Sequence, residues 1–97
     1  MRIGYSPRAV CDLIDIGDYL AERNPLGAIE IERRIRTVVD LIAAFPNSGR
    51  VVEERPSVRA FPLGVYPYLI FYTTTRDEVI ILHIRHAARE PIDPSEL

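Results

Sequence analysis

The stretch that decides the fold is YPYLIFYTTTRDEVIILHIR, at residues 66–85. Its first part, residues 66–74, is rich in aromatic and β-branched residues, which favour a strand. Polar turn residues follow at Thr75-Arg76-Asp77, and residues 78–85 form a second apolar run. The stretch therefore predicts two antiparallel strands joined by a tight turn.

Alternation along residues 78–85 indicates which side of the second strand is buried. Ile80, Leu82 and Ile84 share one face, and we expect this fully apolar face to contact the rest of the core. The opposite face carries the alternate residues of this strand and some of the preceding one: Val79, Ile81, His83, Arg85, Tyr68, Ile70 and Tyr72. We expect that face to be either a partner-binding surface or an ordinary half-solvated sheet.

Two helix starts precede these strands. Ser6-Pro7 and Asn24-Pro25 each place an N-cap residue before a proline, which suits the first helical position. Apolar residues then recur at helical spacing, so we expect antiparallel helices at residues 7–23 and 25–45. Gly17 interrupts the first apolar stripe at a cost of about 1 kcal/mol relative to alanine, so we expect Gly17 at the contact between the helices.

The remaining segments complete an α+β domain. Residues 2–5 predict a strand, residues 50–57 a loop and residues 58–63 another strand, with a turn at Gly64. We therefore expect one domain over residues 1–97, with an N-terminal strand, an antiparallel helical hairpin and a three-stranded antiparallel meander. Both helices should pack on one face of the sheet.

Composition excludes several classes of function. The chain has 97 residues, a formal net charge of −2 and no lysine. It lacks the strong positive bias of an electrostatic nucleic-acid binder, and it cannot form a Schiff base through lysine. A single cysteine, Cys11, excludes a disulfide scaffold, and we expect it to be a buried or half-buried inert thiol. No apolar run is long enough to span a membrane, so we expect a cytoplasmic protein without membrane association.

Six short sequences occur along most of the chain in a characteristic order. They are YSPRA at 5–9, DIGDYL at 15–20, FPNSGR at 45–50, VR at 58–59, YPYLIFY at 66–72 and IRHAAR at 84–89. In this order they resemble the RelE/ParE superfamily of type II toxin–antitoxin toxins, most closely its ParE branch. The resemblance implies a toxin that inhibits DNA gyrase and is neutralised by a cognate antitoxin encoded alongside. It also implies a homodimer or a hetero-oligomer with the antitoxin.

The resemblance leaves a second activity open, because RelE-like relatives are ribosome-dependent mRNA endonucleases. That reaction needs a general base, a general acid and cations at the phosphate. The candidates are Arg59, His83, Arg85 and His86. Against this reading, the chain has neither the lysines nor the tail tyrosine of many such nucleases. His83 lies among apolar strand residues, as a packed histidine does, and Arg59 could instead pair with a carboxylate such as Glu53 or Glu54.

We expect no metal ion and no cofactor. His83 and His86 are three residues apart on or just after a strand, so they point to opposite faces and suit one metal ion poorly. The side chains that we expect to contact the target or the antitoxin are Tyr19, Arg59, Tyr68, Tyr72, Arg85, His86 and Arg89.

Overall fold

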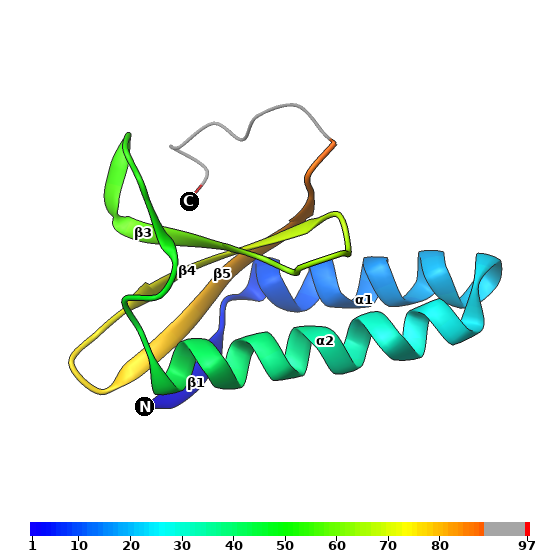
Figure 1. Cartoon of the computed structure of the whole chain (residues 1–97), viewed down its shortest axis with the longest axis horizontal. Coiled ribbons are helices and arrows are strands. Elements are labelled where there is room, and N and C mark those ends of the chain that lie inside the picture. Colours follow the sequence, from blue (N-terminus) through cyan, green and yellow to red (C-terminus); the bar gives the residue numbers. More distant parts are fainter. Residues whose placement is uncertain (89–96) are drawn as a thin grey trace.

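A computed structural model of the chain, which describes residues 1–88 and 97, shows a mixed sheet with a helical hairpin along one side (Figure 1). Its elements, in chain order, are β1 (Arg2–Tyr5), α1 (Pro7–Arg23), α2 (Pro25–Ala44), β2 (Arg50–Val52), β3 (Arg55–Pro62), β4 (Tyr68–Thr74) and β5 (Glu78–His86). The strands lie in the order β1-β5-β4-β3-β2. β1 is parallel to β5, and the other neighbours are antiparallel. The expected α+β class and order of elements are confirmed.

Both helices begin where the sequence predicts. The Ser6 Oγ accepts a hydrogen bond from the Ala9 N–H at 3.1 Å, and the Asn24 Oδ1 accepts one from the Gly27 N–H at 3.0 Å. A proline follows each cap. Proline has no backbone N–H, and in the first turn of a helix an N–H would have no helical partner in any case. Asn24 is the only residue between the helices, so the two run side by side as an antiparallel hairpin.

The main core lies between this hairpin and the sheet. α2 supplies most of the helical side of the core, with Ile31, Ile35, Val38, Val39 and Ile42 buried. From the sheet, the core takes Tyr68, Ile70, Tyr72, Val79, Ile81 and Ile84. α1 buries only Ala9 fully, which leaves much of its surface available.

The faces of β5 differ from the prediction because the strand contains a bulge. Phe71 pairs with His83 and Tyr72 pairs with Ile81, so Leu82 is an extra residue without a partner in β4. An extra residue reverses the alternation of faces beyond it. Val79, Ile81 and Ile84 therefore all face the helices. The expectation was right for Ile84 and wrong for Ile80 and Leu82.

The outer face of the sheet consequently carries other residues than expected. Val58, Ala60 and Phe71 form a small buried cluster there, and Leu82 and the last residue, Leu97, pack against it. Some residues that we expected on that face belong to the main core instead. They are Val79 and Ile81 of β5 and Tyr68, Ile70 and Tyr72 of β4.

Three further expectations need correction. Residues 50–57 are not all loop, because Arg50–Val52 pairs with β3 as a short edge strand. Gly17 is exposed and does not mediate the helix–helix contact, since a Cβ built on it would have no atom within 4 Å. Cys11 is exposed on α1 rather than buried. The turn at Gly64 is confirmed, with a φ of 79° that favours glycine.

Neither helix among residues 1–88 and 97 combines the length and the apolarity that crossing a bilayer requires.

Candidate functional site

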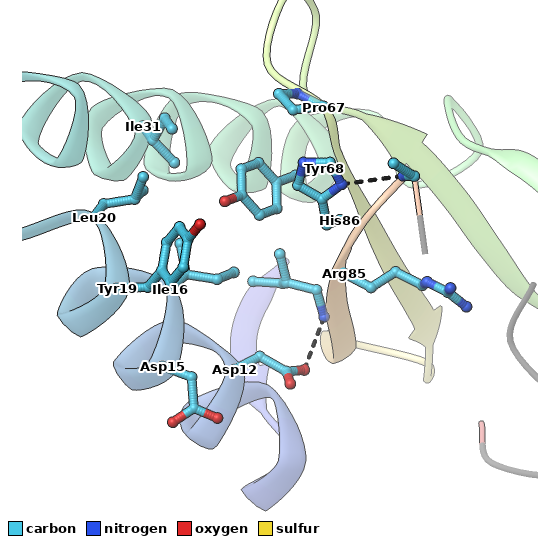
Figure 2. Close-up of a pocket in the computed structure, with 12 residues that line it drawn as sticks. Asp12, Asp15, Ile16, Tyr19, Leu20, Ile31, Pro67, Tyr68, Arg85 and His86 are labelled. Atoms are coloured by element: carbon cyan, nitrogen blue, oxygen red, sulfur yellow. Dashed lines mark hydrogen bonds between the residues drawn. The ribbon is translucent and has the colours of Figure 1, made fainter. Parts of the chain in front are cut away.

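An open groove of about 670 Å³ lies between α1, the start of β4 and the end of β5 (Figure 2). Its floor is apolar and consists of Ile16, Leu20, Ile31 and Ile84. Its rim is polar and consists of Asp12, Asp15, Tyr19, Tyr68, Arg85 and His86. Four of the predicted contact residues, Tyr19, Tyr68, Arg85 and His86, are thus brought together from distant parts of the chain.

Tyr19 forms the α1 wall of this groove. Tyr19 is 56% exposed, and the Arg23 guanidinium carbon lies 3.9 Å from its ring centroid. The Arg23 Nη1 also donates a hydrogen bond to the Tyr19 carbonyl at 3.0 Å. Arg23 therefore holds the tyrosine ring in place, which lowers the entropy lost when a partner contacts it.

Tyr68 and His86 form the opposite wall. They are paired across β4 and β5, and their rings meet edge to face with centroids 5.3 Å apart. The His86 Nδ1 accepts a hydrogen bond from the Ala88 N–H at 3.1 Å, so the Nε2 carries the proton when the ring is neutral. Figure 2 shows Tyr68 reaching across the groove towards α1, whereas the Arg85 side chain extends away from the two tyrosines.

Asp12 connects α1 to the edge of β5 beside the groove through hydrogen bonds. β1 ends at Tyr5, opposite Ile81, so the next residues of β5 have no strand neighbour on that side. The Asp12 Oδ2 accepts hydrogen bonds from the Ile84 N–H at 3.0 Å and from the His83 Nδ1 at 2.6 Å. The Ser6 Oγ donates to the Leu82 carbonyl at 2.8 Å. The Asp12 and Ser6 side chains therefore make the hydrogen bonds to the edge of β5 that a neighbouring strand would otherwise make, and they stabilise the bulge.

His83 is held within this contact. The residue as a whole is 7% exposed, and its ring stacks on Phe71 with centroids 5.9 Å apart. Because a carboxylate only accepts hydrogen bonds, the His83 Nδ1 must carry the proton shared with Asp12. This is the packed, hydrogen-bonded arrangement that its strand position indicates.

Arg59 and Tyr72 lie outside the groove and hold the chain that follows α2. The Tyr72 hydroxyl donates to the Pro46 carbonyl and accepts from the Gly49 N–H, each at 2.8 Å. The Arg59 Nη1 donates to the Gly49 carbonyl at 2.8 Å. A Cβ on Gly49 would lie 2.6 Å from the Tyr72 hydroxyl, so only glycine fits there. The motif at residues 45–50 therefore has a structural explanation.

The last candidate, Arg89, lies outside the described residues. Within residues 1–88 and 97, no three His, Cys, Asp or Glu side chains gather as ligands of a metal ion would. The groove thus offers an apolar floor, two tyrosines, an acidic side at Asp12 and Asp15, and His86 opposite them, with Arg85 at its edge and its side chain extending away. Such a surface suits contact with a partner chain.

Sequence reasoning missed Asp12 and Asp15 as parts of this site. Both lie on the polar flank of an amphipathic helix, where an aspartate is ordinarily solvated. Only the pairing of β1 with β5, together with the bulge, brings Asp12 to a strand edge that needs an acceptor. A signal was present in the DIGDYL motif, which contains Asp15, Ile16, Tyr19 and Leu20.

Sequence and fold both relate this chain to known toxins. Residues 3–91 match the family described as "ParE toxin of type II toxin-antitoxin system, parDE". The chain is 38% identical over 88 residues to Toxin RelE2 of Caulobacter vibrioides, which covers 91% of this chain and 97% of that protein. Its fold is similar to that of a chain from the "Chromosomal ParDE TA system from P. aeruginosa", with a TM-score of 0.75, 25% identity, and coverage of 89% of this chain and 95% of that chain. The chain therefore belongs to the ParE toxin family of type II toxin–antitoxin systems, within the RelE/ParE superfamily.

Proposed function

We propose that this toxin inhibits growth in the cytoplasm by binding DNA gyrase, and that a cognate antitoxin encoded alongside neutralises it. The observation that carries the preference for gyrase over RNA is that His83 is buried and hydrogen-bonded. A general base for RNA cleavage must reach a ribose hydroxyl within about 3 Å. His83 is 7% exposed, hydrogen-bonded to Asp12 and covered by Phe71.

The other ribonuclease candidates do not converge on one point. Arg59 is bound to the carbonyls of Asn47 and Gly49, away from the groove. Only Arg85 and His86 line the groove. The net charge of −2 also favours a protein target over the polyanionic ribosome.

The test is a DNA supercoiling reaction with purified gyrase and the purified chain, run beside an in vitro translation reaction. We expect inhibition of supercoiling with linearised plasmid, and unchanged translation. Arg85→Ala is the site variant, and Arg76→Ala, in the exposed turn between β4 and β5, is the matched control. Inhibited translation with normal supercoiling would contradict the gyrase proposal.

A second candidate function is RNA cleavage, and one observation favours it. Arg85 and His86 are consecutive at the end of β5, and both border an open groove. Arg85 would bind a phosphate from the edge of the groove, and His86, on the other face of β5, would transfer the proton within it. This function predicts that Arg85→Ala and His86→Ala restore translation in the same pair of assays.

We further propose that the groove receives the antitoxin. Its floor suits an apolar side chain from an amphipathic or extended segment, and Arg85 suits an acidic residue beside it. Tyr19→Ala should weaken capture of the antitoxin at least about tenfold, since an aromatic anchor commonly carries more than 1 kcal/mol of binding. Val65→Ala is the control, because Val65 is 91% exposed and lies outside the lining. Equal binding by both variants would remove the groove from the interface.

A further inference from the structure

The α1 side of the groove is acidic, whereas its β5 side is not. Among the twelve residues that line the groove, the acids are Asp12 and Asp15, and both come from α1. Arg85 and His86 come from the end of β5. Because the Arg85 side chain extends away, the two carboxylates dominate the charge within the groove (Figure 2).

Asp15 is the acid that remains available to a partner. The Asp12 Oδ2 already accepts hydrogen bonds from the Ile84 N–H and the His83 Nδ1. Asp15 is exposed, and within residues 1–88 and 97 its side chain has neither an ion pair nor a hydrogen bond. Asp12 and Asp18, three residues before and after it, are like charges on the helix surface. A cation bound at Asp15 would therefore relieve repulsion as well as add attraction.

The bases of α1 lie too far along the helix to neutralise Asp15. Residues 11 and 19, one turn away on either side, are cysteine and tyrosine. Arg8 and Arg23 are seven and eight residues away, about 10 and 12 Å along the helix axis, which exceeds the screening length of about 8 Å at physiological ionic strength. Arg23 also stacks on Tyr19 and pairs with Glu22 at 3.7 Å. A neighbouring base for Asp15 must therefore come from a partner.

The apolar floor beside Asp15 favours a basic side chain with a long stem. Ile16 and Leu20 supply the α1 part of this floor, and both are half-buried. Arginine and lysine bury their methylene stems on apolar surface while their charged heads stay at a polar rim. An acidic side chain would be repelled here, and a short polar side chain would leave the floor uncovered.

We propose that the groove recognises the antitoxin through one basic side chain, an arginine or a lysine, whose stem lies on Ile16 and Leu20 and whose charged head binds the Asp15 carboxylate. This inference rests on the proposed function, in which the groove receives the antitoxin. On the β5 side, the His86 Nδ1 already accepts from the Ala88 N–H, so the ring offers its Nε2–H to an acceptor. The bound segment is thus basic towards α1 and carries an acceptor towards β5, which fixes its orientation across the groove.

Charge reversal at Asp15 tests this recognition, with Asp18→Arg as the matched control. The two variants change the net charge equally and both positions are exposed on α1, but only Asp15 lines the groove. The probe is the product of the neighbouring open reading frame, and both full chains are made separately by cell-free synthesis. In surface plasmon resonance, Asp15→Arg should weaken binding at least about tenfold and slow association, and Asp18→Arg should weaken it less than about threefold.

Compensating changes in the antitoxin identify the basic residue. Each of its arginines and lysines is changed to glutamate in turn. One of these changes should weaken binding to the unmodified chain about tenfold, and it should return binding by Asp15→Arg to within about threefold of the unmodified pair. The thermal midpoint of Asp15→Arg should stay within about 4 °C of the unmodified chain, so that unfolding does not account for its effect.

Two results overturn the basic-residue proposal. One is an equal effect of Asp15→Arg and Asp18→Arg, and the other is a loss at Asp15→Arg that no antitoxin variant restores. Tyr19→Ala separates this failure from failure of the groove itself, because it weakens binding whenever the antitoxin occupies the groove. If Tyr19→Ala and Asp15→Arg both leave binding unchanged, the antitoxin does not bind in the groove, and both proposals are wrong.

Discussion

Asp12→Ala should be the most informative destabilising change in this fold, because one carboxylate oxygen serves two donors. Its removal leaves the Ile84 N–H and the His83 Nδ1–H without an acceptor. The Asp12 and His83 side chains are only 18% and 9% exposed, so water replaces little of what is lost. Hydrogen bonds to charged groups contribute about 1.5–3 kcal/mol each, so losing the two gives about 3–6 kcal/mol.

For a domain of this size, about 1 kcal/mol shifts the midpoint by roughly 4–8 °C, so thermal unfolding should begin at least about 12 °C lower. Circular dichroism with urea titration gives the free energy directly. Asp12→Asn retains one acceptor and should lose about 1–2 kcal/mol. Asp15→Ala, one turn along the same helix and exposed, is the control and should melt like the unmodified chain. A midpoint for Asp12→Ala within 2 °C of that control would refute the argument that α1 closes the edge of β5.

Four other variants test contacts elsewhere in the fold. Tyr72→Phe should lower the free energy of unfolding by about 1–3 kcal/mol in urea, because the buried Gly49 N–H and the half-buried Pro46 carbonyl lose their partner. Arg59→Ala should also destabilise the fold, by about 1–2 kcal/mol, whereas Arg85→Ala should leave the thermal midpoint unchanged and reduce toxicity on induced expression. Burial and then the neighbouring Asp40 raise the pKa of Tyr5, so its contribution to stability is complete below pH 10 and declines at higher pH. Tyr5→Phe should flatten that decline in unfolding midpoints measured between pH 9 and 11.

The sequence predicts local structure well where a residue acts through its immediate neighbours in the chain. Proline after serine or asparagine locates both helix starts, because a cap and a missing N–H act within a single turn. The bulge at Leu82 was not predictable in this way, since an extra strand residue leaves the apolar run intact and changes only its pairing. The groove could be predicted only in part. Tyr19 and Tyr68 are recognisable as unusual residues, but their proximity depends on the order of the strands.

The parallel pairing of β1 with β5 has a consequence for how this toxin folds during its synthesis. Arg2 can pair only after Glu78 has been translated, because among residues 1–88 and 97 β5 is the one strand beside β1. At 5–20 residues per second, that interval lasts about 4–15 seconds on the ribosome. Throughout it the helical hairpin can form, since its contacts are local, but Asp12 has no strand edge to bind. The edge of the sheet that Asp12 and β1 close is therefore absent from the nascent chain until β5 has been translated.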